Sequence, residues 1–363
     1  MAPPALEHPE PENCVGPQSE EAGKASACDG CPNQKVCASG AAKEDDPAVA
    51  QVAAQLKNVR RKVLVLSGKG GVGKSTVASQ LAFGLASRGL RVGLLDIDIC
   101  GPSAPLMLGV RGEAVHSSAS GWSPVWVSVP QLDSADADEE GELGIVAVGY
   151  LFFTFARLWP RSPDQLIIRS GISSLTQHIS AVQYLKQSLG PHDGAVVVST
   201  PQEASMADVR KELNFCKKTS LQVLGVVENM ASLVTPLSSV KAVDKSGNDI
   251  TARLLSAVRA SDPALIDECE LETAVFPTGN ATPQVSGTAG LGLAGPERMA
   301  FEFGVPFLGR LPLDPAVGRA CDAGQMIASI GAQGRAAVAV RALCDRLVLD
   351  LHLGEEDAGA MDM

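Results

Sequence analysis

The sequence predicts an α/β fold in which a mostly parallel sheet is flanked by helices. Apolar runs alternate with amphipathic stretches from Val59 to Leu349, and such alternation is typical of strands and helices that build a parallel sheet. The segment 62–67 contains a short continuous apolar run, as strands covered on both faces do. A glycine-rich loop follows this run and leads into a helical pattern.

Each further expected strand is a short apolar run, and each expected helix is an amphipathic stretch between such runs. In chain order, the expected strands are residues 62–67, 91–95, 144–148, 194–200, 221–227 and 306–311. The expected helices are residues 74–88, 204–217 and 335–347.

Composition divides the chain into segments. Residues 1–45 are rich in Pro, Glu, Ala, Gly and Cys, a composition that cannot bury enough apolar surface to fold unaided. Residues 46–60 are expected to be a linker, and residues 61–350 the α/β domain. Within that domain, residues of about 240–295 are more polar and rich in glycine, so we expect an insertion there. Residues 351–363 form an acidic tail.

The charge and the apolar pattern exclude several functions. The chain has 41 acidic and 30 basic residues and a net charge of -11, which repels phosphate backbones, so we expect no nucleic-acid partner. The first dozen residues lack the pattern of a secretory or transit signal. The most apolar uncharged run, residues 143–156, is shorter than the roughly 18 residues of a membrane span, so no membrane partner is expected. Nine cysteines without an export signal indicate a reducing compartment, and we expect a cytoplasmic protein.

The glycine-rich loop has the pattern of a Walker A phosphate-binding loop, because it lies between an apolar strand and an amphipathic helix. Its glycines allow backbone amides to surround the phosphates, and the following helix directs its positive end toward them. Lys74 is expected to contact the β- and γ-phosphates of ATP, and the Ser75 hydroxyl to bind Mg²⁺. The alternative is a plain glycine-rich turn. The expected nucleotide-binding residues of the loop are Gly68, Lys69, Gly70, Gly71, Val72, Gly73, Lys74, Ser75 and Thr76.

Two carboxylates, Asp96 and Asp98, follow the next expected strand. Ligand sites in α/β sheets lie at the carboxyl ends of parallel strands, so both are candidates for the nucleotide site. The alternative is that they only cap the following turn.

Four cysteines lie close together near the N-terminus, in a segment with little else to fold around. Cys14, Cys28, Cys31 and Cys37 have the spacing C-x13-C-x2-C-x5-C, and four thiolates are the ligand set of a metal site. Zinc and an iron–sulfur cluster both suit sulfur ligation, and the spacing alone leaves the two open.

Lys69, the early lysine of the loop, resembles the deviant Walker A lysine of septum-site, plasmid-partition and arsenite-pump ATPases. That resemblance implies that Lys69 reaches the nucleotide of a partner chain, and that the working unit is a dimer with the nucleotides between the subunits. It also implies that Asp96 lies near Mg²⁺ and Asp98 near the attacking water. The catalytic residues that we expect are therefore Lys69, Lys74 and Asp98.

Over most of residues 13–325 the chain resembles the cytosolic iron–sulfur cluster assembly factor of the nucleotide-binding-protein (NUBP) type, in the Mrp/NBP ATPase family. The motifs that carry the resemblance, besides the cysteines and the loop, are residues 96–103, 200–203, 208–212, 214–218, 225–230, 304–315 and 321–322. The resemblance implies that the four cysteines hold a [4Fe-4S] cluster and that Asn229 lies near the adenine ring.

By the same resemblance we expect an ATP-binding scaffold that assembles [4Fe-4S] clusters and transfers them to cytosolic and nuclear apo-proteins. Its expected partners are a second copy of itself or a related ATPase, apo iron–sulfur proteins and downstream assembly factors. An alternative function is a non-hydrolysing nucleotide-binding regulator with a structural zinc or docking module at its N-terminus. A partition-type ATPase that acts on DNA is disfavoured by the net charge.

One departure from that family concerns its second switch. The family has a buried strand that ends in Asp-x-Pro-Pro-Gly, whose aspartate orients Mg²⁺, but the only Pro-Pro pair here is Pro3-Pro4. At residues 169–178 the sequence passes directly from the region before that strand to the region after it, so we expect one core strand and the second switch to be deleted. Either the gene model is incomplete, which the poor fit of residues 150–162 favours, or the chain is a divergent copy with impaired hydrolysis. At most a weak ATPase is expected.

A second departure concerns the Cys-Pro-x-Cys pair that bridges the dimer in many relatives. Residues 233–241, which follow Asn229 and Met230, contain no cysteine, and this resembles the plant and green-algal branch of the family. Cys269 and Cys321 are candidate substitutes, although isolated cysteines are more often plain core residues.

Overall fold

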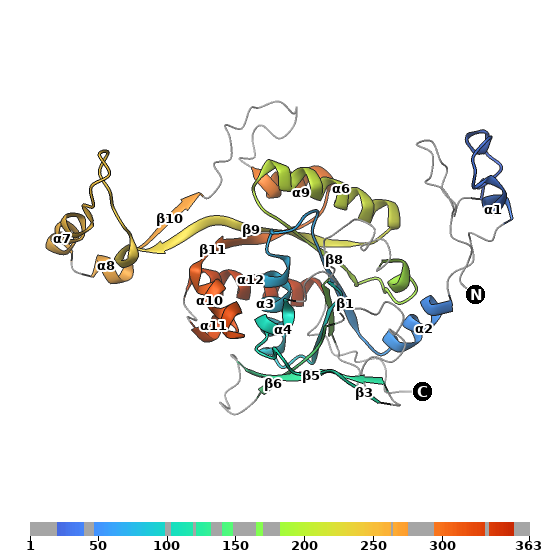
Figure 1. Ribbon diagram of the computed structural model, residues 1–363, viewed down its shortest axis with the longest axis horizontal. Helices are drawn as coiled ribbons and strands as arrows, with labels where there is room; N and C mark the ends of the chain where they lie inside the picture. The colour runs from blue at the N-terminus through green and yellow to red at the C-terminus, as the bar shows by residue number, and fades with distance from the viewer. Residues whose placement is uncertain are drawn as a thin grey trace.

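The computed structural model describes residues 20–39, 47–98, 103–118, 121–131, 140–147, 165–169, 182–262, 264–274, 294–330 and 334–351. Within these residues, one large sheet forms the centre of the molecule, and helices pack on both of its faces (Figure 1). No helix in the described ranges is both long and apolar enough to cross a bilayer.

The large sheet has nine strands in the described part of the chain, in the order β10-β9-β8-β1-β7-β2-β6-β5, with β11 also paired to β9. Its strands are β1 (Arg61–Leu66), β2 (Val92–Asp96), β5 (Val125–Pro130), β6 (Glu140–Ala147), β7 (Gln165–Arg169), β8 (Gly194–Ser199), β9 (Val223–Pro236), β10 (Glu270–Ala274) and β11 (Phe307–Leu313). All pairs are parallel except β5 with β6 and β10 with β9, at the two ends of the sheet. A separate hairpin joins β3 (His116–Ser118) and β4 (Gly121–Ser123).

The helices belong to two layers. In chain order they are η1 (Ser26–Cys28), α1 (Gln34–Ala38), α2 (Pro47–Leu56), α3 (Lys74–Ala86), α4 (Ala104–Met107), α6 (Glu203–Thr219), η4 (Leu237–Ser239), α7 (Thr251–Ser261), α8 (Leu265–Glu268), α9 (Gly295–Phe303), α10 (Pro315–Ala323), α11 (Ile327–Ile330) and α12 (Arg335–Asp350). Helices α3, α4 and α10–α12 share one apolar core, and α2, α6 and α9 share the other.

Strand β1 shows how the sequence produces two cores. Side chains alternate across a strand, and Val63 and Val65 enter the core beneath α3, whereas Leu64 and Leu66 enter the core beneath α6. Because both faces are covered, residues 63–66 are all apolar, which explains the continuous run in the sequence. Helix α3 is buried along most of its length, so it is apolar on nearly all sides.

The predicted fold class is confirmed. The six expected strands correspond to β1, β2, β6, β8, β9 and β11, and the three expected helices to α3, α6 and α12. The region expected to be an insertion contains η4, α7, α8 and β10. Strand β9 extends to Pro236, beyond its expected end, because β10 pairs with its last five residues.

The predicted deletion of a core strand is wrong. Strand β7 lies between β1 and β2 and is parallel to both, so the sheet has no gap there. Its last residue, Arg169, is in register with Val65 on one side and Asp96 on the other. The apolar segment 166–168 suffices to form a strand between two buried neighbours, even though no Asp-x-Pro-Pro-Gly motif follows it. The expected loss of the second switch itself falls in residues 170–181, outside the described residues.

Candidate nucleotide site

The phosphate loop joins β1 to α3 and contains two glycines in the left-handed region. Gly71 has φ 79° and Gly73 has φ 86°, conformations that non-glycine residues adopt only at a cost. Gly73 also has no room for a side chain, since a Cβ atom there would lie 2.1 Å from Asn229 Nδ2. Two independent constraints therefore require glycine at position 73.

Asn229, in β9 two strands away from β1, contacts the loop directly. Its side chain is buried, and Nδ2 donates a hydrogen bond of 2.9 Å to the carbonyl oxygen of Val72. The next residue, Met230, has φ 57°, which is unusual for a residue other than glycine and is often found at functional sites. Asn229 therefore contacts the loop, and its expected place near the adenine ring stays a prediction.

Helix α6 supports the other side of the loop. A Cβ atom at Gly68 would lie 2.4 Å from the backbone carbonyl carbon of Asp208, so the loop backbone packs closely on this helix. Lys69 Nζ donates a hydrogen bond of 3.4 Å to Gln202 Oε1 at the N-terminus of α6. In the single chain, Lys69 is therefore directed toward its own α6, and its expected role in a partner's site stays a prediction.

Lys74, Ser75 and Thr76 form the first turn of α3, where the positive end of the helix faces the loop. Lys74 is 2% exposed, which is rare for a lysine. Ser75 and Thr76 are half-buried. The expected roles of Lys74 in binding phosphate and of Ser75 in binding Mg²⁺ stay predictions.

Asp96 ends β2 and is completely buried. Its Oδ1 accepts a hydrogen bond of 3.0 Å from the backbone N–H of Asp98, and its Oδ2 one of 3.4 Å from that of Ala104. Asp96 thus organises the backbone after the strand, which is the capping role that the sequence left open. Asp98 is half-buried.

Ser103, the last residue of the 96–103 motif, has a hydroxyl that is buried without a hydrogen-bond partner in the described structure. It precedes Ala104, the residue that donates to Asp96. An orphaned hydroxyl beside a buried carboxylate suits a cation or an ordered water, and oxygen donors are the ligands that Mg²⁺ prefers. The hydroxyls of Ser75 and Ser103 and the Asp96 carboxylate therefore fit Mg²⁺ by their chemistry.

Helix α1, in the cysteine-rich segment, lies to one side of the sheet (Figure 1). Cys28 in η1 is buried, and the thiols of Cys31 and Cys37 are half-buried. The backbone N–H of Cys31 donates to the Cys28 carbonyl at 3.1 Å, so the C-x2-C pair occupies one tight turn. Cys14 lies outside the described residues, and among those described no three Cys, His, Asp or Glu side chains gather as a metal site. The cysteine thiols suit the predicted metal, but in the described residues they do not come together as a metal site.

The remaining described cysteines differ in reactivity. Burial raises the pKa of Cys216 and of Cys344 to about 12, so both are neutral core thiols. Burial also raises the pKa of Cys321, which contacts Gln80 of α3 at 4.0 Å. A metal ligand must be a thiolate, so Cys321 is poorly suited to replace a bridging ligand. Cys269 is half-buried.

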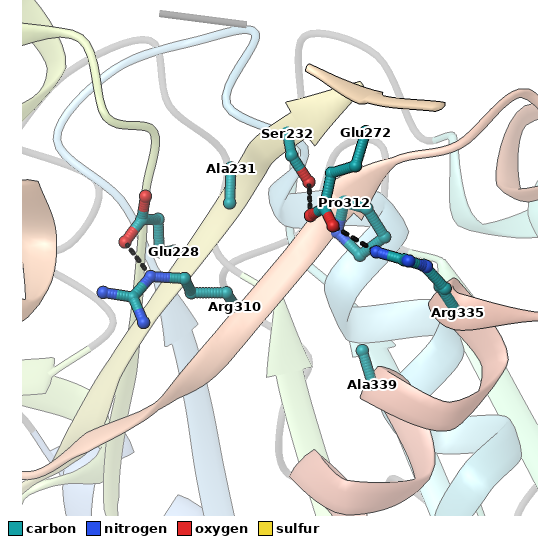
Figure 2. Close-up of a pocket in the computed structure, with 8 residues that line it drawn as sticks. All are labelled: Glu228, Ala231, Ser232, Glu272, Arg310, Pro312, Arg335 and Ala339. Carbon is teal, nitrogen blue, oxygen red and sulfur yellow. Dashed lines mark hydrogen bonds and ion pairs between the residues drawn. The ribbon is translucent and has the colours of Figure 1, made fainter. Parts of the chain in front are cut away.

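A pocket of about 450 Å³ opens between β9, β10, β11 and the start of α12 (Figure 2). Glu228 Oε2 accepts from Arg310 Nε at 3.2 Å, and Glu272 Oε1 accepts from the Ser232 hydroxyl at 2.6 Å and also pairs with Arg335. Burial raises the pKa of Glu228, while Arg310 opposes this. Sequence reasoning missed this pocket because its residues come from four distant segments.

The structure combines a central parallel sheet with a strand–loop–helix unit that has left-handed glycines, a buried loop lysine and a carboxylate at the end of a nearby strand. This combination defines the class of P-loop NTPases. The chain belongs to the ParA family, described as NUBPL iron-transfer P-loop NTPase, whose model matches residues 58–142 and 164–261, slightly more than half of the 363 residues. The second matched range includes β7.

The chain is similar to several solved structures. A nucleotide-binding protein from Archaeoglobus fulgidus, solved in complex with ADP, is 25% identical with a TM-score of 0.53 over 77% of this chain and 92% of that one. The septum site-determining protein MinD from Pyrococcus horikoshii, solved with Mg-ADP, is 17% identical with a TM-score of 0.49 over 79% and 95%. A ParA family ATPase from Chlorobium tepidum is 16% identical with a TM-score of 0.45 over 82% and 99%.

Proposed function

We propose that the chain is an ATP-binding scaffold that assembles [4Fe-4S] clusters and transfers them to cytosolic and nuclear apo-proteins. One observation supports the proposal most directly. The chain belongs to an iron-transfer family and has both a phosphate loop and a cysteine-rich segment. The cluster is the cargo of this function. ATP and its hydrolysis would change the geometry of a dimer and so control loading or release.

In this proposal the residues of the loop bind the triphosphate. Backbone amides of residues 68–73 and the N-terminus of α3 surround the phosphates, and Lys74 neutralises the β- and γ-phosphates. Asn229 holds the loop in shape through the Val72 carbonyl. Ser75, Asp96 and Ser103 would hold Mg²⁺, which neutralises phosphate charge when it is bound. Asp98, after the strand end, would orient the attacking water.

The thiolates of Cys14, Cys28, Cys31 and Cys37 would hold the cluster at the N-terminus, on residues 1–45. Residues 46–60 would link this segment to the ATPase domain of residues 61–350, and residues 351–363 would be an acidic tail. We further propose a cytoplasmic protein that works as a homodimer, or with a related ATPase, and hands clusters to apo-proteins and downstream assembly factors.

Anaerobic reconstitution of the full chain with iron and sulfide tests the cargo. The wild type should bind about four irons and four sulfides and show a broad visible absorption that is lost in Cys28→Ala/Cys31→Ala. Cys216→Ala is the matched control, because this thiol is buried in the core and lies in another segment. Zinc in protein isolated without air, with no iron uptake, would overturn the proposed cargo.

A second candidate function is a nucleotide-binding regulator that does not hydrolyse ATP. One observation favours it: β7, the strand beside β1, ends in Arg169 and not in an aspartate that could orient Mg²⁺. Phosphate release by the wild type and by Lys74→Ala separates the two functions. Equal background rates, with ATP binding retained by the wild type, would favour the regulator.

A further inference from the structure

Strand β8 lies on the other side of β1 from β7 and ends beside the phosphate loop. It is parallel to β1, and Val197 is in register with Leu66, the last residue of β1. A short segment, residues 200–203, leads from β8 into α6, the helix that packs against the loop at Gly68. These residues form one of the motifs that carry the family resemblance, yet none of them binds phosphate or metal in the proposed function.

Successive side chains of β8 enter different faces of the sheet. Val196 and Val198 enter the core beneath α3, whereas the hydroxyl of Ser199 lies 3.5 Å from that of Ser205 in α6. By this alternation the next side chain, that of Thr200, belongs to the α3 side of the sheet, which is the side to which the phosphate loop leads.

The register with β9 sets Thr200 beside Asn229, because Ser199 is paired with the residue before Asn229. Asn229 donates to a carbonyl oxygen of the loop. From the loop, Lys69 Nζ donates to Gln202 Oε1 at 3.4 Å, two residues after Thr200. Thr200 therefore lies between two contacts that join the loop to the ends of the neighbouring strands.

The hydroxyl of Thr200 is buried and has no hydrogen-bond partner within the described part of the chain, and the whole residue is 3% exposed. An unpaired buried hydroxyl destabilises a protein, and native structures contain few of them. Valine has nearly the same shape without the hydroxyl, and positions 196 and 198 on the same face are both valine. A threonine at position 200 therefore needs an explanation other than the packing of the core.

We propose that Thr200 is a positioning residue for the phosphate loop, whose hydroxyl donates a hydrogen bond to a backbone carbonyl oxygen of residues 68–70 when the loop surrounds the triphosphate. This bond stabilises the closed loop and keeps its backbone amides directed at the phosphates. Thr200 itself does not contact the nucleotide. The proposal rests on the nucleotide binding of the proposed function and adds a residue to it. The competing interpretation is a packing role, in which the hydroxyl contributes nothing to binding.

Isothermal titration of the full chain with ATP and Mg²⁺ compares the wild type with Thr200→Val and Thr200→Ser. Loss of one hydrogen bond should weaken ATP binding by Thr200→Val about threefold to tenfold. Thr200→Ser keeps the hydroxyl and should bind ATP as the wild type does. Thr219→Val is the matched control, because it makes the same change at the far end of α6, where the hydroxyl donates to the Phe215 carbonyl oxygen at 2.9 Å. Its ATP affinity should be unchanged.

Thermal unfolding without nucleotide separates positioning of the loop from packing of the core. Thr200→Val should keep or raise the melting temperature, because it removes an unpaired buried hydroxyl. If Thr200→Val does not fold, Thr200→Ala takes its place and is compared with Thr200→Ser.

Two outcomes would overturn the proposal and leave the proposed function intact. One is an unchanged dissociation constant for ATP in Thr200→Val. The other is a lower melting temperature of Thr200→Val without nucleotide, since the hydroxyl would then already contribute to the fold. A wild type that binds no ATP would overturn the proposed function as well.

Discussion

At Gly73, one residue of the phosphate loop is restricted both by its backbone and by its neighbour. Its φ of 86° is left-handed, and an added Cβ would lie 2.1 Å from the Asn229 amide nitrogen. Asn229 cannot easily move away, because it donates to the Val72 carbonyl. Loop shape and sheet packing are thus coupled through one side chain.

Gly73→Ala should therefore lower the free energy of unfolding by about 2 kcal/mol or more, since the left-handed backbone alone costs roughly 1–2 kcal/mol. ATP affinity should fall with it, because the loop must shift. Gly70→Ala is the matched control: no atom lies within 4 Å of its added Cβ, and its φ is not left-handed. Urea unfolding of both variants checks this, and equal losses of stability would contradict the structural explanation.

At the scale of elements, sequence and structure agree where the information is local. The phosphate loop and the strands beside it are predicted because glycines and fully apolar runs have few other interpretations. Strand β7 was missed because the prediction relied on a motif after the strand, although the apolar segment 166–168 alone supports a strand between two buried neighbours. Strand β10 was missed because it depends on pairing with the distant end of β9.

A buried ion pair fixes the beginning of β1 to the turn before β8. Lys62 Nζ lies 3.1 Å from Asp193 Oδ2, and the backbone N–H of Lys62 donates to Asp193 Oδ1 at 2.7 Å. Both side chains are almost fully buried. Because β1 leads directly into the phosphate loop, this pair helps to set the position of the loop.

Asp193→Ala should lower the free energy of unfolding by about 3–5 kcal/mol, because it leaves a buried ammonium without its carboxylate. Asp350→Ala removes the partner of Arg346 in an exposed pair on α12, and we expect a change of about 1 kcal/mol or less. Chemical denaturation at neutral pH measures both. A cost for Asp193→Ala no greater than that for the control would mean that the pair does not anchor the strand.

At the scale of the whole molecule, the candidate site divides into a part that the sequence reveals and a part that only the fold assembles. The loop and Asp96 belong to short motifs. The pocket lined by Glu228, Glu272 and Arg310 depends on contacts between distant segments, and no local pattern signals such contacts. The N-terminal cysteines are clear in the sequence, but their gathering depends on a metal that the polypeptide alone does not supply.

The dimer that we propose gives Lys69 a role that a single chain cannot show. Within one chain its Nζ lies 3.4 Å from Gln202 Oε1, a weak contact that stabilises the fold little. Lys69→Ala should therefore leave the melting temperature nearly unchanged and abolish dimer formation induced by ATP, which light scattering coupled to gel filtration measures. Lys211→Ala, on the exposed side of α6, is the control and should dimerise normally. The contact to Gln202 lies within one chain, so its loss does not affect association. An unchanged dimer fraction in Lys69→Ala would therefore show that Lys69 does not bridge two subunits.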